Sequence, residues 1–254
     1  MRNRKRICCL LAVVLVFVCS FGFGEGLRYE GEGFDTPEAA VACYMEGLKN
    51  LDFEQMLSAF AWETQAEHYS VEAQLSWVRS YNPGTYPRMP AVNEFVKTAN
   101  LEGIRIKEIR TIYNGLEKYI MGEDYPDGLA VPLTEEGSVE EFAASFDNGR
   151  LEKLAGMAEV QFFSPDMVTG GKFSLEMNKE TFRKMTAAYG ADEVVNVVAA
   201  AALEQGLVIC MPTVARYGEK WYMVSLSSMM ANILGIPTNS LALIYVEDLS
   251  ELGL

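Results

Sequence analysis

Apolar residues in the first third of the chain recur at the spacing of helix faces. The pattern predicts three helices, each preceded by a residue whose side chain can cap it: Thr36, Asp52 and Ser70. The first helix is expected to end at Asn50, and the third is expected to stop at Asn82-Pro83-Gly84, a strong turn signal. The ordered part of the chain therefore begins with helices.

The middle of the chain has a less regular pattern. The apolar spacing over residues 92–99 predicts another helix, whereas residues 104–113 fit the helical and the strand period in part. Residues 122–137 are rich in proline and glycine and are expected to form a loop. A capping box then opens a short helix over residues 138–146.

The last hundred residues carry the strand signals. Alternation of apolar and polar residues predicts four strands, at residues 158–162, 173–177, 207–217 and 220–226. Two helices, at residues 178–190 and 192–206, are expected between the two pairs of strands. Gly218-Glu219 has glycine first, as a type II′ turn prefers, and predicts a hairpin of the last two strands.

The order of these elements indicates the fold class. Helices come first and strands come later, which is typical of an α+β protein. The alternation along the strands is one-sided, as expected for an antiparallel sheet that is covered on one face. We therefore expect N-terminal helices packed on an antiparallel sheet.

Residues 1–24 have the layout of a secretory signal peptide. Basic residues come first, an apolar run follows from Ile7 to Val18, and small residues close the segment. The segment Ile7–Gly24 also reaches the low end of the ~17–25 residues that span a membrane, so a retained anchor is the alternative. A lipid anchor on Cys19 is a third option, disfavoured by the bulky Val18 before it. We expect an exported protein, either secreted or anchored with its domain outside the cytoplasm.

Half of the residues are hydrophobic and 22% are charged, which is the balance of an ordinary globular protein. The formal net charge is −14, and a polyanion of this size repels nucleic-acid phosphates and anionic lipid headgroups. Beyond residue 24 no apolar stretch is long enough to span a bilayer. We expect no nucleic-acid partner, and membrane contact only through residues 1–24 if they are retained.

The remaining chain divides into two parts. Residues 25–33 contain three glycines and are expected to form a flexible lead. Residues 34–254 are expected to form a single α+β domain with an insertion around residues 86–149. Two cysteines, Cys43 and Cys210, lie in this domain. Export favours a disulfide between them, but they are equally suited to remain unpaired small hydrophobic residues, and the sequence leaves both alternatives open.

Two segments together resemble a known family. The first is residues 35–54, with Asp35-Thr36-Pro37-Glu38-Ala39-Ala40-Val41 at its start, and the second is the hairpin of residues 214–224, with Gly218-Glu219-Lys220-Trp221 at its turn. They resemble the nuclear transport factor 2-like superfamily, especially its small exported bacterial members. The resemblance covers under a third of the chain, within residues 34–81 and 207–226. It implies a strongly curved antiparallel sheet wrapped over helices, with a cone-shaped apolar pocket.

The chain also departs from that family. Its middle is longer than one cone domain requires, helical insertions are expected between the strand pairs, and residues 227–254 form a C-terminal extension. Ketosteroid-isomerase-like members pair an Asp base with an oxyanion hole built from Tyr and a protonated Asp. No local motif of this sequence places those roles, so the resemblance assigns no catalytic residue.

His68 is the single histidine of the chain. It lies among polar residues just before the Ser70 cap, as a surface or helix-end histidine does. A general base would need an orienting carboxylate, and Glu63 and Glu67 are candidates by their nearness in sequence. A lone histidine is a poor metal site, because zinc takes three or four protein ligands.

Other chemical motifs are weak or missing. The sequence contains no nucleophile elbow, phosphate loop or dinucleotide fingerprint. Gly170-Gly171-Lys172 lacks the spacing of a phosphate loop and is expected in a turn between strands. The acidic loop at residues 123–128 lacks the ligand pattern of an EF-hand, and Cys43 has no histidine at a fixed spacing. We assign no catalytic residue, no metal and no cofactor.

Aromatic side chains suit either a pocket lining or a core. The candidates are Tyr44, Phe60, Trp62, Trp77, Phe162, Trp221 and Tyr222. We therefore expect an exported, non-catalytic protein that binds an apolar small ligand or a protein partner at the cell envelope. The alternative is an isomerase or dehydratase that uses the cone pocket. The sequence leaves the ligand-binding residues, the partner and the oligomeric state open.

Overall fold

The structure is a computed structural model. It describes residues 30–79, 92–121, 133–135, 137–144, 149–204, 206–226, 228–234 and 243–246. The leader, the turn at Asn82-Pro83-Gly84 and the acidic loop at residues 123–128 lie outside the described residues.

Four helices open the described chain: α2 (Pro37–Asn50), α3 (Phe53–Ser58), α4 (Trp62–His68) and α5 (Val71–Val78). Each of the three expected caps is present. Thr36 Oγ1 accepts a hydrogen bond from Ala39 N, and the Asp52 and Ser70 side chains accept from the backbone three residues ahead. The helix α4 was not expected from the sequence.

The lead is tied to the body from Glu30 onward. The Glu30 carboxylate accepts hydrogen bonds from the Thr64 backbone, at 3.0 Å, and from the Thr64 hydroxyl, so it caps the first turn of α4. Gly31 N donates to Ser58 O at 3.0 Å, and Phe34 exchanges two backbone hydrogen bonds with Trp221. These bonds join the start of the domain to the hairpin near its end.

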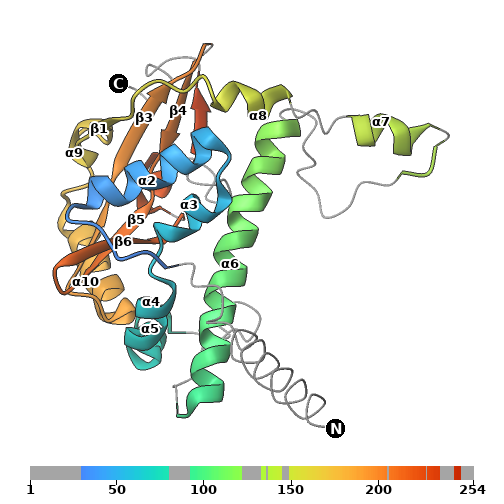
Figure 1. The fold of residues 1–254 in the computed structure, drawn as a ribbon. Coiled ribbons are helices and arrows are strands. Elements are labelled where there is room, and N and C mark those ends of the chain that lie inside the picture. The colour runs from blue at the N-terminus through green and yellow to red at the C-terminus, as the bar shows by residue number, and fades with distance from the viewer. Residues whose placement is uncertain are drawn as a thin grey trace, which may run out of the picture.

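A single long helix, α6 (Glu94–Met121), spans the middle region. It settles the ambiguous residues 104–113 as helix, and it includes most of the helix expected over residues 92–99. The short helices α7 (Ser138–Ala144) and α8 (Gly149–Leu154) follow. Figure 1 shows α6 along one side of the molecule, with α7 set apart from the body.

The strands form two antiparallel sheets that meet at a bend, and we call the two together the bent sheet. Their bounds are β1 (Gln161–Phe163), β2 (Glu193–Asn196), β3 (Val198–Ala202), β4 (Leu207–Cys210), β5 (Thr213–Tyr217), β6 (Lys220–Ser225) and β7 (Leu243–Val246). One half has the order β1-β3-β4-β7 and the other has the order β2-β5-β6. Only Val197 separates β2 from β3, and Val197 N donates to Pro212 O at 3.2 Å across the bend. This hydrogen bond joins the two halves at the bend.

The expected helix over residues 192–206 is wrong, because this segment forms β2 and β3. Its alanines suggest a helix by propensity alone. In the structure Ala199, Ala200 and Ala201 pair with β4, and each is at most 6% exposed. Alanine suits a strand that is packed on both faces, so tertiary packing overrides the local preference.

Two other strand predictions also need correction. Residues 173–177 form no strand; a turn leads there into α10 (Glu176–Tyr189), which ends at Gly190 as expected. The strand expected over residues 158–162 is shorter and begins at Gln161.

The start of α10 also differs from the prediction. Asn178 does not cap α10, since its side chain donates to Lys172 O at 2.7 Å. A short helix, α9 (Pro165–Val168), lies between β1 and α10.

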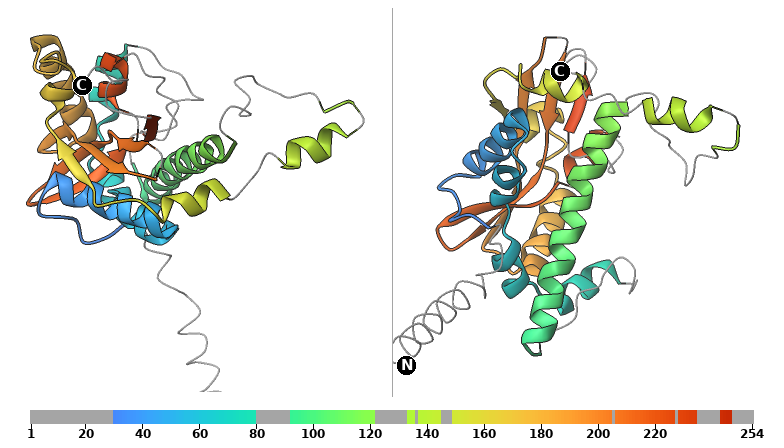
Figure 2. Two further views of the ribbon diagram at one scale, coloured as in Figure 1. Left: turned by 90° about the horizontal axis from the view of Figure 1, so that it is seen from above. Right: turned by 45° about the vertical axis from the view of Figure 1, so that its right-hand side comes forward.

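Helices cover both faces of the sheet (Figures 1 and 2). The inner face carries α2, α3 and α6, and the outer face carries α10, α9 and α11 (Met229–Leu234). The expectation of one covered face is wrong, because consecutive strand residues are both apolar: Val208 joins the inner core and Ile209 the outer one. The α+β class, with N-terminal helices on an antiparallel sheet, is confirmed.

Candidate functional site

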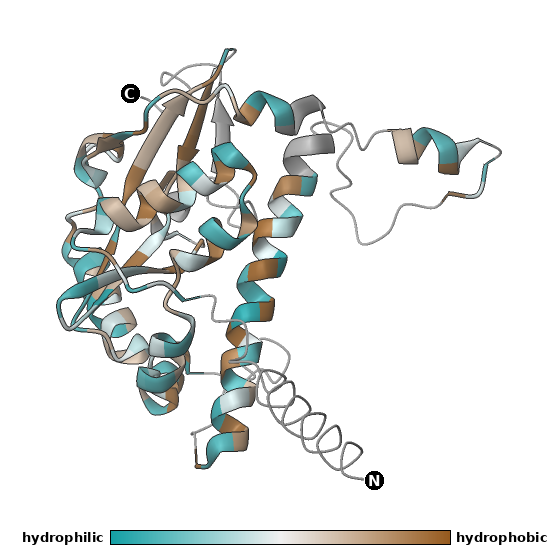
Figure 3. Cartoon of the chain, viewed as in Figure 1, coloured by the Kyte–Doolittle hydropathy of each residue, from teal (hydrophilic) through white to brown (hydrophobic). Residues whose placement is uncertain are grey.

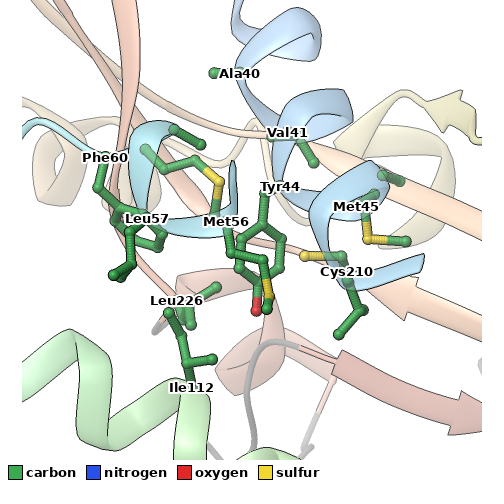
Figure 4. Packing of buried hydrophobic residues seen from close by; sticks show 14 of the residues in the cluster. Ala40, Val41, Tyr44, Met45, Met56, Leu57, Phe60, Ile112, Cys210 and Leu226 are labelled. Atoms are coloured by element: carbon green, nitrogen blue, oxygen red, sulfur yellow. The ribbon is translucent and has the colours of Figure 1, made fainter. Parts of the chain in front are cut away.

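The inside of the bent sheet is the place where the resemblance implies a pocket. Figure 4 shows this region filled by side chains. Tyr44 points from α2 into the middle of the packing, with Met56 of α3 and Cys210 of β4 on either side, and Ile112 of α6 and Leu226 close the far end. All five residues are at most 1% exposed.

The aromatic residues of the inner face are core residues. Tyr44 and Phe60 meet edge to face at 6.0 Å between ring centroids, and Phe60 stacks on Trp62 at 4.8 Å. The Trp62 indole donates to Leu57 O at 2.7 Å, which satisfies its buried N–H group. These rings fix α2, α3 and α4 against one another.

Two polar groups nevertheless lie inside this core. The Tyr44 hydroxyl has no hydrogen-bond partner among the described residues. Glu108 of α6 is 2% exposed; its carboxylate lies 3.1 Å from Lys107 Nζ and accepts from Leu226 N at 3.4 Å. Burial raises the pKa of Tyr44 well above its ordinary value, and nearby Cys210 and Glu108 add to the rise. The phenol therefore stays neutral at physiological pH.

The two cysteines are separate thiols. Cys210 is fully buried, and this burial strongly raises the pKa of its thiol, which makes it a poor nucleophile. Cys43 is half-buried, with its sulfur 3.8 Å from Ser58 Oγ. Of the two alternatives left open by the sequence, the unpaired one holds in the structure.

His68 is the last residue of α4 and is exposed. Its Nδ1 lies 2.8 Å from Thr64 O, and its ring lies 5.4 Å from that of Tyr217. The two carboxylates that are near it in sequence contact cations of α6 instead: Glu67 pairs with Lys97 at 2.7 Å and Glu63 with Arg105 at 3.5 Å. His68 is thus a helix-end histidine, as its sequence context indicates.

An open pocket of about 380 Å³ lies beside His68. Its lining comes from α4, the end of α10 and the β5–β6 hairpin: Thr64, His68, Gly190, Asp192, Tyr217, Gly218, Lys220 and Tyr222. The charged groups of the lining are engaged, since Lys220 pairs with Asp35 at 2.7 Å and Asp192 accepts from Gly218 N at 2.7 Å. Sequence reasoning missed this pocket because its residues are brought together only by the fold.

The remaining candidates from the sequence are scattered. Trp77 packs partly buried against the outer core, and Phe162 is 39% exposed. Trp221 is half-buried, with the Arg216 guanidinium 5.8 Å from its ring centroid. Gly170-Gly171-Lys172 lies in the turn between α9 and α10 rather than between strands, and both glycines have positive φ.

The outer face of α6 exposes a line of large apolar residues. Phe95 is 79% exposed, Ile106 is 55% exposed and Tyr113 is 58% exposed. Their spacing of eleven and seven residues places them at nearly the same angle around the helix. Figure 3 shows brown segments recurring along α6. We call the heptad positions that follow this line the α6 seam; they are Phe95, Ala99, Glu102, Ile106, Ile109, Tyr113 and Leu116. Ile109 and Leu116 lie at the edge of the seam, because they are partly buried and also pack against the inner core.

Two kinds of site have no candidate within the described ranges. No group of three or more His, Cys, Asp or Glu side chains is placed to hold a metal ion there. No helix among the described elements has the length and apolar character that a membrane span requires.

Comparisons with known proteins add little. No family model and no curated protein matches this chain. A solved structure described as a cystatin-like protein from Ruminococcus gnavus is similar, with a TM-score of 0.43 and 14% identity. The match covers 84% of this chain and 45% of that chain, so the chain spans less than half the length of that protein. Membership of the nuclear transport factor 2-like superfamily stays a prediction.

Proposed function

We propose that this chain is an exported, non-catalytic protein that binds a protein partner by helix packing on the α6 seam. The observation that carries the proposal is the exposure of Phe95, Ile106 and Tyr113 on one line of a 28-residue helix. Large apolar residues that gather on one exposed face are typical of interaction sites, whereas single ones are normal on any surface. An amphipathic partner helix would pack its apolar face against these three residues.

The packing inside the sheet favours a protein partner over an apolar small ligand. The place where the cone pocket is expected is occupied by Tyr44, Met56 and Leu226, each at most 1% exposed. A ligand there would have to displace side chains that contribute to the main core.

The site of action follows from the leader. Residues 1–24 favour export, by cleavage or with a retained anchor. Protease treatment of host cells whose outer layers have been opened osmotically, with the cytoplasmic membrane left intact, tests this proposal. Digestion of the domain while a cytoplasmic marker protein survives is the expected result, and full protection of the domain in osmotically opened cells would contradict it.

Photo-crosslinking in the host tests the binding face. A benzoyl-phenylalanine placed at Ile106, on the seam, is compared with one at Lys184, an exposed position of α10. We expect a discrete adduct from Ile106 that disappears when Phe95 and Tyr113 are both changed to Ser. Equal adducts from the two positions, or none from Ile106, would contradict the proposed face.

An enzyme of the isomerase or dehydratase type is the second candidate. It is supported by one observation, the neutral Tyr44 phenol that lies near the buried Glu108 carboxylate inside the sheet. Proton transfer in such a site needs a carboxyl group whose pKa is far above its ordinary value. A carbon-13 NMR titration of Glu108 tests this candidate. A measured pKa in the ordinary range of a glutamate would exclude the enzyme function.

A further inference from the structure

The charge along α6 differs from that of the whole chain. The helix has five basic and four acidic residues in its 28 positions. The chain as a whole has a net charge of −14. Two copies of such a chain repel one another over most approaches. An approach along α6 brings together two helices whose own charges nearly balance, and it covers Phe95, Ile106 and Tyr113.

The seam has the pattern of a helix-pairing surface. Six of its seven positions are apolar, and they alternate at spacings of four and three residues, as in a heptad repeat. The polar exception is Glu102, which bonds to Arg105 of its own helix at 2.7 Å. A polar residue at one core position of a heptad sets the direction and register of pairing at a cost in stability.

Glu102 disfavours an in-register parallel pair of α6 helices. In a parallel pair each seam residue meets the same residue of the other copy, so two Glu102 carboxylates would be brought together. Like charges in a partly desolvated contact repel strongly. In an antiparallel pair centred near residue 104, Glu102 instead lies opposite the partner's Ile106, and the two Glu102 carboxylates no longer face each other.

The same register matches the remaining seam positions. Phe95 then lies opposite the partner's Tyr113, which forms an aromatic pair at each end. Ala99 lies opposite the partner's Ile109. The arrangement obeys a twofold axis, so every contact occurs twice, as an isologous dimer requires.

We propose that the partner on the α6 seam is a second copy of this chain, bound with its α6 antiparallel in the register Phe95 to the partner's Tyr113. This inference rests on the proposed function, since it names the partner of the same surface. The seam is short compared with the 20–30 residues per side of a standard interface. The dimer is therefore a weak one, which forms at micromolar or higher concentration.

Cysteine crosslinking of the full chain tests the register. The variant with both Phe95→Cys and Tyr113→Cys is treated with a short bismaleimide, beside each single variant and the wild type. In the antiparallel pair, position 95 of one copy lies 18 residues along the helix from position 95 of the other, or about 27 Å. A short bismaleimide cannot span this distance, so a single variant cannot be crosslinked in this register. We expect the double variant to give at least tenfold more covalent dimer than either single variant. Dimer from the single variants alone would overturn the antiparallel register.

Sedimentation equilibrium provides a second measurement that needs no cysteine. We expect the mass of the wild type to rise with concentration, and Ile106→Lys to weaken self-association at least tenfold. Met177→Lys is the matched control, because Met177 is 74% exposed on α10, away from the seam. A wild type that stays monomeric at every concentration would overturn the second copy as partner. A photo-crosslink from Ile106 to a different protein would then still support the proposed function.

Discussion

The two faces of α6 are built from similar residues but have different surroundings. Ile104 and Ile112 on the inner face are at most 2% exposed, whereas Ile106 on the outer face is 55% exposed. The helix is therefore apolar over more of its circumference than its place in one chain requires. Hydrophobicity alone does not separate a core residue from a contact residue; the neighbouring elements decide which it becomes.

The polar residues of the helix reinforce this contrast. Glu108 lies within the inner face at 2% exposure, while Glu102 of the outer face has a side chain that is 52% exposed. A buried carboxylate is costly unless it is bonded. Glu108 on the inner face is thus held by specific contacts, whereas Glu102 on the outer face is half-exposed and bonds to Arg105.

The largest expected effect separates two isoleucines. Ile112→Ala should lower the free energy of unfolding by about 2–5 kcal/mol, because it leaves a cavity in the main core. Ile106→Ala should change it by less than about 0.5 kcal/mol. Urea denaturation of the two variants at low protein concentration measures both. Equal losses of stability would show that Ile106 is as tightly packed as Ile112.

A pair of glutamates gives the next largest effect. Glu108→Ala removes the acceptor of the Leu226 N–H group and should cost about 1–3 kcal/mol of unfolding free energy. Glu102→Ala removes one ion pair near the surface and should cost less than about 1 kcal/mol. Repeating the denaturation at high salt should shrink the Glu102 effect and leave the Glu108 effect. The reverse dependence on salt would contradict the assignment of the two faces.

Two tyrosines, one buried and one exposed, should differ in the opposite direction, because here the buried substitution is expected to raise the free energy of unfolding. Tyr44→Phe removes a buried hydroxyl that lacks a partner in the described part of the chain, so it should raise the free energy of unfolding by about 1 kcal/mol. Tyr113→Phe removes a hydroxyl from a residue that is 58% exposed and should have almost no effect. A clear loss of stability in Tyr44→Phe would show that the hydroxyl is bonded.

The smallest expected effect is a pH dependence that arises at Glu30. Burial raises the pKa of its carboxyl above 4.5, although the hydrogen bonds from Thr64 and Glu63 act in the opposite direction. The folded state then binds the proton more tightly than the unfolded chain. Relative to Glu30→Gln, the wild type should be most stable below pH 4.5 and lose that advantage as the pH rises through the raised pKa. A relative stability that increases with pH would contradict this sign.

Elements with strong local signals were predictable from the sequence. The caps at Thr36, Asp52 and Ser70 and the hairpin turn at Gly218-Glu219 depend on neighbours in the chain. The segment 192–206 was not predictable in this way. Its valines and alanines form an apolar run that only Asn196 interrupts, and such a run fits a buried helix and a strand packed on both faces equally well.

The candidate site was less predictable than the fold. His68 was correctly placed at a helix end, but the α6 seam was missed because residues 104–113 fit two periods. Once the segment is known to be helical, the spacing of Phe95, Ile106 and Tyr113 becomes a clear signal. The filled interior of the sheet depends on contacts between distant elements, such as Ile112 with Leu226, and no local pattern predicts it.

The bonds of the lead also set a limit for proteolytic trimming. Exopeptidases that shorten the chain from its start and reach Glu30 remove its hydrogen bonds to Thr64. Removal of Glu30 deprives α4 of its cap, and removal of Phe34 opens the paired backbone of Trp221. Trimming that passes Glu30 should therefore destabilise the domain, and trimming that passes Phe34 should destabilise it further.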